Sequence, residues 1–154
     1  MISGGLVALA ERPDQWAQVV NNEGVLPTAV DEMLRWTTPV TSFLRTATNT
    51  TTLGDQVIEE GDPVLLVYAS ANFDEAVFGP TASEFDVTRS PNPHVSFGVG
   101  NHFCLGAALA RMEAEVILRG LRQRAASISL TGDVERSPSS IISGVRHATL
   151  RLTN

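Results

Sequence analysis

The ten residues Phe97–Gly106 read Phe-Gly-Val-Gly-Asn-His-Phe-Cys-Leu-Gly and are the most informative stretch of the sequence. They hold the single cysteine of the chain, Cys104, among Gly98, Gly100 and Gly106, and an alanine-rich apolar run follows. Glycine admits backbone conformations that other residues resist and presents no side chain. A cysteine binds metal as its thiolate, and the start of a helix favours an anion. The pattern is therefore typical of a thiolate that binds a metal from one side, with a flat ligand against the backbone.

These ten residues alone leave more than one interpretation open. A lone cysteine is often a small buried hydrophobe without any ligand. One cysteine and three scattered histidines do not provide the spacing of a four-ligand zinc site. The glycines also lie outside a strand-to-helix nucleotide fingerprint. If a flat ligand is present, we expect His102, two residues before Cys104, to reach its edge and bind an acidic substituent.

Composition narrows the class of protein. The chain has 154 residues, of which 43% are hydrophobic and 18% charged, which suits one globular domain with a sizeable core. The net charge of −6 argues against nucleic acid as a partner, because phosphate binding needs a basic surface. One cysteine excludes an internal disulfide framework and fits a reducing compartment, so we expect a cytoplasmic protein. No apolar stretch approaches the roughly 20 residues of a membrane span, and residues 1–10 do not read as a signal peptide.

Hydrophobic periodicity and turn residues predict an α+β chain that is mainly helical. The predicted helices cover residues 4–20, interrupted at Pro13, then 27–39, a turn at 73–78 and, most clearly, 105–124. The predicted strands lie within 40–52, at 57–58 and, as a buried strand, at 64–68, with further short strands after residue 127. Residues 79–99 have little periodicity, and a loop of this length is usually functional or disordered.

The positions Phe97-Gly98-x-Gly100-x-His102-x-Cys104-x-Gly106 resemble the haem-binding signature of the cytochrome P450 monooxygenases at every fixed position. In that family the cysteine is the axial iron ligand, and its thiolate pushes electron density toward iron to favour cleavage of dioxygen. The resemblance implies haem b as the cofactor, Cys104 as the iron ligand and His102 as a contact of one haem propionate. The other cofactor-binding residues that it implies are Phe97, Gly98, Gly100 and Gly106.

A second pair of residues supports the same family. Glu32 and Arg35 lie three apart on a predicted helix and share a face, where an isolated ion pair usually contributes little. The resemblance implies instead the buried Glu-x-x-Arg pair of the family, locked to a third residue from the loop before the cysteine. Our candidate for that structural residue is Arg89. Removing one partner from such a cluster strands a buried charge.

The resemblance also assigns residues around the cofactor. Arg45 corresponds to a basic residue that binds the other propionate, although a surface arginine on a strand is the alternative. Two segments are similar to parts of the family that line the substrate pocket, and ordinary core is their alternative. The substrate-pocket candidates in these segments are Val40, Thr41, Phe43, Ile141 and Ile142.

The resemblance runs along the whole chain but corresponds to the C-terminal part of the family. We therefore expect residues 1–154 to form a single partial domain, a cysteine loop leading into a long helix beside small sheets. Met1–Gly5 is similar to the downstream end of the long central helix on the distal face of the haem. Most of that helix, the N-terminal part and the acid–threonine pair that delivers protons to dioxygen have no counterpart, so no catalytic residue is assigned. Oxygen activation needs a dry distal pocket and a proton path.

Other segments resemble soluble bacterial members that hydroxylate steroid or cholesterol side chains, namely 32–37, 70–75 and 85–87. The implied reaction inserts one oxygen atom from dioxygen into a small apolar substrate, here a steroid, with electrons from a donor such as a ferredoxin and its reductase. On the last long helix we expect a basic face that helps to dock this donor, or a plain solvated face. That face comprises Arg111, Arg119 and Arg122, and we expect the core to bury Leu109, Met112, Val116 and Ile117.

Two further functions stay open from the sequence. One is a truncated, non-catalytic module that keeps the cysteine loop and binds haem. The other is an inactive remnant that binds no haem and exposes apolar surface. The family is one of oxidoreductases, whereas the sequence does not decide whether this chain is active by itself.

Overall fold

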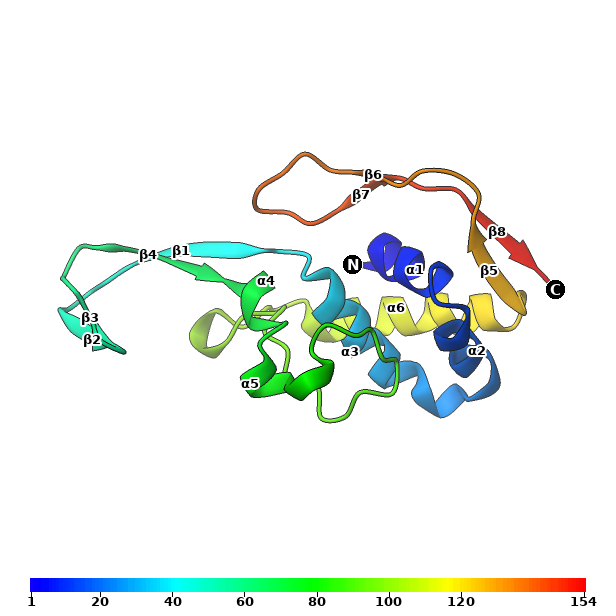
Figure 1. Ribbon diagram of the computed structural model, residues 1–154, viewed down its shortest axis with the longest axis horizontal. Helices are drawn as coiled ribbons and strands as arrows, with labels where there is room; N and C mark the ends of the chain where they lie inside the picture. Colours follow the sequence, from blue (N-terminus) through cyan, green and yellow to red (C-terminus); the bar gives the residue numbers. More distant parts are fainter.

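The computed structural model describes residues 1–154 and combines a helical body with four small antiparallel sheets (Figure 1). The helices are α1 (Ile2–Ala10), α2 (Pro13–Asn21), α3 (Leu26–Thr37), α4 (Tyr68–Ala71), α5 (Glu75–Phe78) and α6 (Ala107–Arg122). Single 3-10 turns, η1 to η3, cover Glu23–Val25, Gly79–Thr81 and Gly100–His102. The strands are β1 (Ser42–Thr46), β2 (Thr51–Leu53), β3 (Gln56–Ile58), β4 (Pro63–Val67), β5 (Ser127–Leu130), β6 (Glu135–Arg136), β7 (Val145–His147) and β8 (Leu150–Thr153). The predicted α+β class is confirmed.

Local sequence explains the helix boundaries. Pro13 opens α2 and Pro27 lies in the first turn of α3, where a missing backbone N–H costs little. Helix α3 ends at Thr38, whose φ of 34° is left-handed and ends the helical run. Helix α1 approaches α3 so closely that a Cβ on Gly5 would lie 2.2 Å from the Met33 methyl carbon. The helices predicted at 4–20, 27–39 and 105–124 are confirmed, with boundaries shifted by a few residues.

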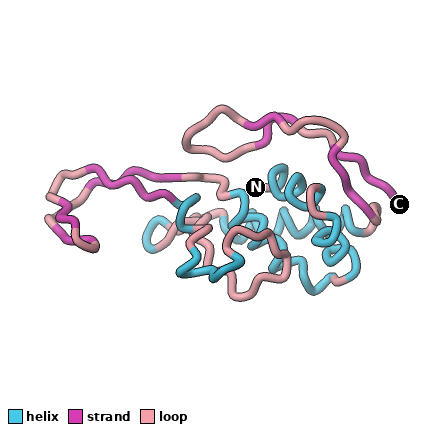
Figure 2. Tube along the Cα trace, in the orientation of Figure 1, coloured by secondary structure: helices cyan, strands magenta, loops and turns pink.

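The core lies where α1, α2, α3 and the inner face of α6 meet. Its largest fully buried side chains include Leu9, Trp16, Leu26, Met33 and Leu118. Strand β5 adds Ile128 from the C-terminal part of the chain. Figure 2 shows the helices gathered in the middle of the molecule, with the strands at its edges.

Each sheet consists of two antiparallel strands, in the pairs β1–β4, β2–β3, β5–β8 and β6–β7. The first two pairs extend away from the helices, whereas β6–β7 passes over α1 and β5–β8 lies beside α1 and α2 (Figure 1). The predicted buried strand at 64–68 is wrong in one respect, because β4 is largely exposed and Leu65 is 59% accessible. Only β1 pairs with β4 and no second layer covers either strand. Tyr68 is buried, but it begins α4.

Candidate cofactor site

The cysteine loop, residues 97–106, is a closed turn that precedes α6. The amide of Cys104 donates to the carbonyl of Phe97 at 2.9 Å and joins the two ends of the loop. Gly98 and Gly100 have φ values of 72° and 65°, in the left-handed region that glycine enters without a steric penalty. The two glycines thus make the fold of the loop possible, and the Cys104 side chain is exposed.

Helix α6 begins later than the sequence predicted. Its first residue is Ala107 and its N-cap is Gly106, so Cys104 lies two residues before the cap. The amide of Ala107 donates to the carbonyl of Cys104 at 3.2 Å, which makes a turn between the loop and the helix. A Cβ on Gly106 would lie 3.9 Å from the Cys104 sulfur, an ordinary contact distance. Gly106 therefore caps α6 beside the sulfur.

One cavity of about 380 Å³ brings together residues from four parts of the chain. Cys104 and His102 reach it from the loop, and Arg45 reaches it from β1. The Arg45 guanidinium carbon lies 5.3 Å from the ring centroid of Phe43. The remaining lining residues are Val40, Phe43, Tyr68, Ser96, Phe97 and Gly98. The cavity thus combines one thiol and two basic side chains with apolar and aromatic walls.

The predicted substrate-pocket segments lie beside one another. Val40 and Ile142 form an isolated antiparallel bridge, although they are 102 positions apart in the numbering. The Thr41 amide donates to the carbonyl of Ile141 at 2.8 Å, and its hydroxyl donates to the carbonyl of Ser140 at 2.9 Å. Val40 also lines the cavity of Cys104, whereas Ile141 and Ile142 are about half exposed. The two segments thus form one continuous edge that begins at the cavity.

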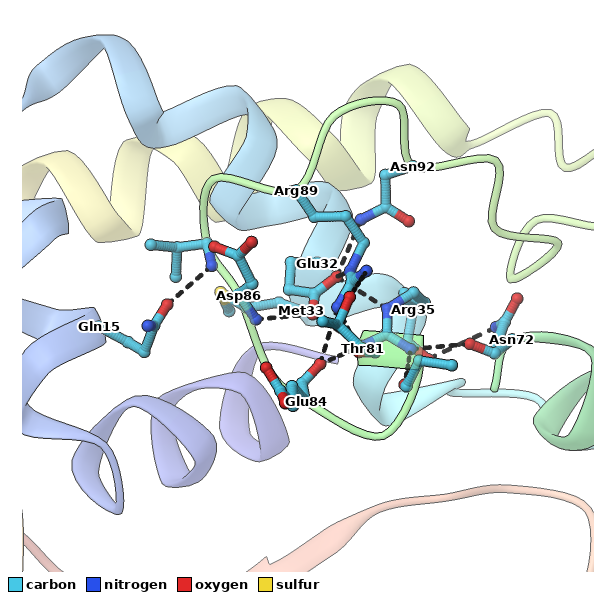
Figure 3. A network of polar contacts seen from close by, with 12 residues as sticks. Gln15, Glu32, Met33, Arg35, Asn72, Thr81, Glu84, Asp86, Arg89 and Asn92 are labelled. Atoms are coloured by element: carbon cyan, nitrogen blue, oxygen red, sulfur yellow. Dashed lines mark hydrogen bonds and ion pairs between the residues drawn. The ribbon is translucent and has the colours of Figure 1, made fainter. Parts of the chain in front are cut away.

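Glu32 lies at the centre of a buried ion cluster (Figure 3). Its two carboxylate oxygens each accept a hydrogen bond from Arg35 at 2.8 Å, and one also accepts from Arg89 Nε at 3.2 Å. The side chains of Glu32 and Arg35 are fully buried and that of Arg89 is 8% exposed. Such a cluster depends on all its partners, because a buried charge without a partner is very unfavourable. Arg35 also donates to the carbonyls of Asn72, Ala82 and Glu84.

Two asparagines extend this cluster, and neither was among the predicted site residues. Asn92 donates to a Glu32 oxygen at 3.0 Å. Asn72 is fully buried, and its side chain bonds to three residues in two segments of the chain. Their partners lie 23 to 60 positions away, so no local pattern could have indicated these contacts.

Asp31 connects α3 with α6 and with the segment before the cysteine loop. Its carboxylate accepts from Arg111 Nε at 2.8 Å and contacts His94 Nε2 at 3.4 Å. Burial by itself raises the pKa of Asp31, but the hydrogen bonds and positive charges of His94 and Arg111 outweigh it and lower the pKa below its usual range. The Arg111 guanidinium carbon also lies 4.8 Å from the ring centroid of Phe97. Arg111 therefore contacts the cysteine loop directly.

The predicted orientation of α6 is wrong. The core buries Ala107, Ala114 and Leu118, whose small or well-fitting side chains permit a close approach to α3. The longer apolar side chains that we expected to be buried are exposed, namely Leu109, Met112, Val116 and Ile117. These four residues are called the outer face of α6 below.

The three arginines of the predicted basic face of α6 are all paired with acidic side chains. Arg111 pairs with Asp31, and both Arg119 and Arg122 pair with Glu23. Arg122 donates further to the carbonyls of Val19 and Val20 and thereby holds α2. Because each arginine has an acidic neighbour, the three charges do not add up to a free basic patch.

The model of the cytochrome P450 family matches residues 10–124. The chain belongs to the cytochrome P450 family. Cytochrome P450 126 of Mycobacterium tuberculosis is 46% identical over 151 residues, which are 98% of this chain and 36% of that protein. A steroid C26-monooxygenase of Rhodococcus jostii is 44% identical over 146 residues, which are 94% of this chain and 30% of that protein.

Solved P450 structures share the fold as well as the sequence. CYP109E1 of Bacillus megaterium, solved with testosterone, superposes with a TM-score of 0.92 at 30% identity. The match covers 99% of this chain and 42% of CYP109E1. CYP108D1 of Novosphingobium aromaticivorans gives a TM-score of 0.91 at 42% identity and covers 98% of this chain and 36% of that one. This P450 chain thus spans about a third of the length of its relatives, and none of its helices is long and apolar enough to cross a membrane.

The cavity of this P450 chain has the chemistry that a haem needs. Cys104 offers a thiol, which as a thiolate is a soft ligand that suits iron. The chain has no cluster of three or more His, Cys, Asp or Glu side chains that could hold a metal ion by itself. Arg45 and His102 offer donors for acidic substituents, and the aromatic walls suit a flat apolar ring system. At Gly98 a Cβ would occupy space 3.6 Å from the His102 carbonyl and 3.7 Å from the Tyr68 hydroxyl. The residues present therefore fit the cofactor of the family.

Proposed function

We propose that this chain supplies the haem-holding part of a cytochrome P450 monooxygenase, with the Cys104 thiolate as the axial ligand of haem b. The single observation that carries the proposal is the common cavity of Cys104, His102 and Arg45, three residues that the family resemblance assigns to the same cofactor. When bound, haem supplies the activation of dioxygen that permits insertion of one oxygen atom into an apolar substrate. As a proposal, residues 1–154 form one partial domain of that enzyme, about a third of its length.

The residues of the chain would share the work of holding the cofactor. Cys104 would bind the iron from the loop side, while the Arg45 guanidinium and the His102 ring would donate hydrogen bonds to the two propionates. Phe97, Gly98, Gly100 and Gly106 shape the loop, because two of these glycines have left-handed backbones and one caps α6. Glu32, Arg35 and Arg89 act at a distance by fixing α3 and the segment 81–92.

The substrate that we propose is a small apolar molecule of the steroid class. Val40, Thr41 and Phe43 would form one wall of its pocket, and Ile141 and Ile142 the adjoining wall. Support comes from the bridge between Val40 and Ile142 and from relatives that are named steroid C26-monooxygenases. We assign the electron supply to a donor such as a ferredoxin with its reductase, on the basis of the family and not of a basic patch on α6.

Haem binding gives the direct test. The purified chain is titrated with haemin, reduced and exposed to carbon monoxide, and the Soret band of the complex reports thiolate ligation. We expect the thiolate band for the natural chain and its loss in Cys104→Ser. Asn101→Ala changes an exposed residue of the same loop and should retain the band, which makes it the matched control.

The alternatives give different results in the same experiment. A natural chain without any thiolate band would contradict the proposal and favour an inactive remnant. A band at the same position in Cys104→Ser would show that the signal does not come from this chain, because Cys104 is its only cysteine. Turnover of a steroid with an electron donor, measured on the assembled enzyme, separates a monooxygenase part from a non-catalytic haem-binding module.

A further inference from the structure

Asn72 is a buried polar residue that the proposed function does not use. It follows α4 and its side chain is fully buried. The amide nitrogen donates to the hydroxyl oxygens of Thr38 and Ser96, at 2.9 Å each. The amide oxygen accepts from the backbone N–H of Val95 at 2.8 Å. The side chain thus makes bonds to two separate segments at once.

The direction of these hydrogen bonds is fixed by their surroundings. The Thr38 hydroxyl donates to the carbonyl of Arg35 at 2.8 Å, and the Ser96 hydroxyl donates to the carbonyl of Leu34 at 2.8 Å. Each hydroxyl has one proton, so both must accept from the amide nitrogen of Asn72. The Val95 N–H can only donate, so it requires the amide oxygen. Only an asparagine side chain in this orientation satisfies all three partners.

The segments joined by Asn72 are the two that lead to the cavity. Thr38 ends α3 in a left-handed conformation, and the chain continues from it into β1, which carries Arg45. Val95 and Ser96 directly precede Phe97, whose carbonyl closes the cysteine loop. By contrast, no side-chain hydrogen bond of Glu32, Arg35 or Arg89 reaches residues 95–104. The buried cluster therefore continues to the cysteine loop through Asn72, to which Arg35 donates at the backbone carbonyl.

We propose that Asn72 is a positioning residue that holds the cysteine loop against the end of α3 and so sets Cys104 relative to Arg45. The purpose of this positioning rests on the proposed haem-holding function. The hydrogen bonds of Asn72 themselves are present without any ligand. Asn72 touches neither the cavity nor a reacting atom, and it acts through Val95, Ser96 and Thr38.

Backbone hydrogen exchange of the chain tests the positioning directly. Asn72→Asp keeps the shape and the acceptor for Val95 but removes both donors, and Ser96→Ala removes one acceptor and leaves Asn72 intact. In both variants we expect the amides of Val95, Gly98 and Cys104 to exchange about ten- to a hundredfold faster, relative to the amides of α1 and α2. Leu9→Ala is the control, because it creates a cavity in the core and should accelerate α1 and α2 first.

The outcomes separate positioning from general loss of stability. If all amides of Ser96→Ala exchange faster by the same factor, the variant is merely destabilised and the proposal is overturned. Loop amides that exchange as slowly in Ser96→Ala as in the natural chain would also overturn it. If Asn72→Asp does not fold, Ser96→Ala alone decides.

A second measurement relates the positioning to haem. Haemin affinity in the thiolate-ligated state should fall about tenfold in Asn72→Asp relative to Leu9→Ala. Equal affinities in these two variants would contradict the positioning role. If the natural chain binds no haem, the proposed function fails, and the exchange rates still decide whether Asn72 holds the loop.

Discussion

The two faces of α6 are covered in very different ways. The inner face buries Ala107, Ala114 and Leu118, and the last two belong to one continuous core. The outer face leaves Met112 and Val116 about 60% exposed, and they line an open depression together with Ile2, Glu113 and Ile117. Soluble proteins rarely leave so large an apolar stripe without a partner.

The unequal coverage of the two faces of α6 is in keeping with the length of the chain, which matches only part of each P450 relative. The chain spans about a third of its relatives, and the part that it spans holds its own core and a complete buried ion cluster. Outside this core lie the cysteine cavity, the exposed strand β4 and the outer face of α6. The core and its ion cluster should therefore determine the stability of the chain, and the exposed regions should determine its association with other chains.

The largest expected effect on stability concerns the buried ion cluster of Glu32. Glu32→Ala leaves Arg35 and Arg89 buried without their carboxylate, which should lower the free energy of unfolding by about 3–5 kcal/mol. Denaturant titration followed by circular dichroism measures the change. Glu60→Ala removes an exposed carboxylate as a control, and an equal effect of both substitutions would show that the cluster is not a stabilising centre.

A pair of truncations compares the two faces of α6 directly. Leu118→Ala should cost about 2–5 kcal/mol, because it opens a cavity in the core. Val116→Ala, two residues earlier, should change the free energy of unfolding by about 0.5 kcal/mol or less. The same titration measures both variants. Similar losses would mean that the outer face is covered in solution.

Self-association of the chain should depend on the outer face of α6 and not on its inner face. If the outer face pairs with another copy of the chain, Met112→Glu places a charge in that contact and should raise the dissociation constant about tenfold or more. Analytical ultracentrifugation over a range of concentrations measures this constant, and Thr52→Glu on β2 provides the same charge elsewhere. A natural chain that is monomeric throughout would rule out self-association through this face.

The helices and the ion pair could be predicted from local sequence, because their causes are local. Pro27 opens α3, and Glu32 and Arg35 lie on one face at a spacing of three. The cysteine loop could also be predicted from local sequence, since Gly98 and Gly100 stand where the backbone is left-handed.

The coverage of α6 and the role of Asn72 could not be predicted in this way. Periodicity identifies an apolar stripe but does not say whether another part of the molecule covers it, and on α6 the alanine-rich side packs on the core. The pairing of Arg119 and Arg122 with Glu23 joins elements about a hundred positions apart. Contacts of this range depend on the fold and leave no spacing in the sequence.

The smallest expected effect is the pH dependence contributed by Asp31 where α3 meets α6. Because its pKa is lower in the folded chain than in the unfolded chain, its pairing stabilises the fold above the unfolded pKa of about 4 and is lost as the pH falls through the folded value. The carboxylate is about one third exposed, so solvent screening keeps this contribution below about 1 kcal/mol. Asp31→Asn should remove it, so that the stability difference from the natural chain shrinks between about pH 6 and pH 3. Urea titrations at both pH values measure the difference, and Asp55→Asn, at an exposed turn, controls for the loss of charge. A difference that stays constant with pH would mean that Asp31 is not held by Arg111 and His94, and that the inner face of α6 rests on apolar packing alone.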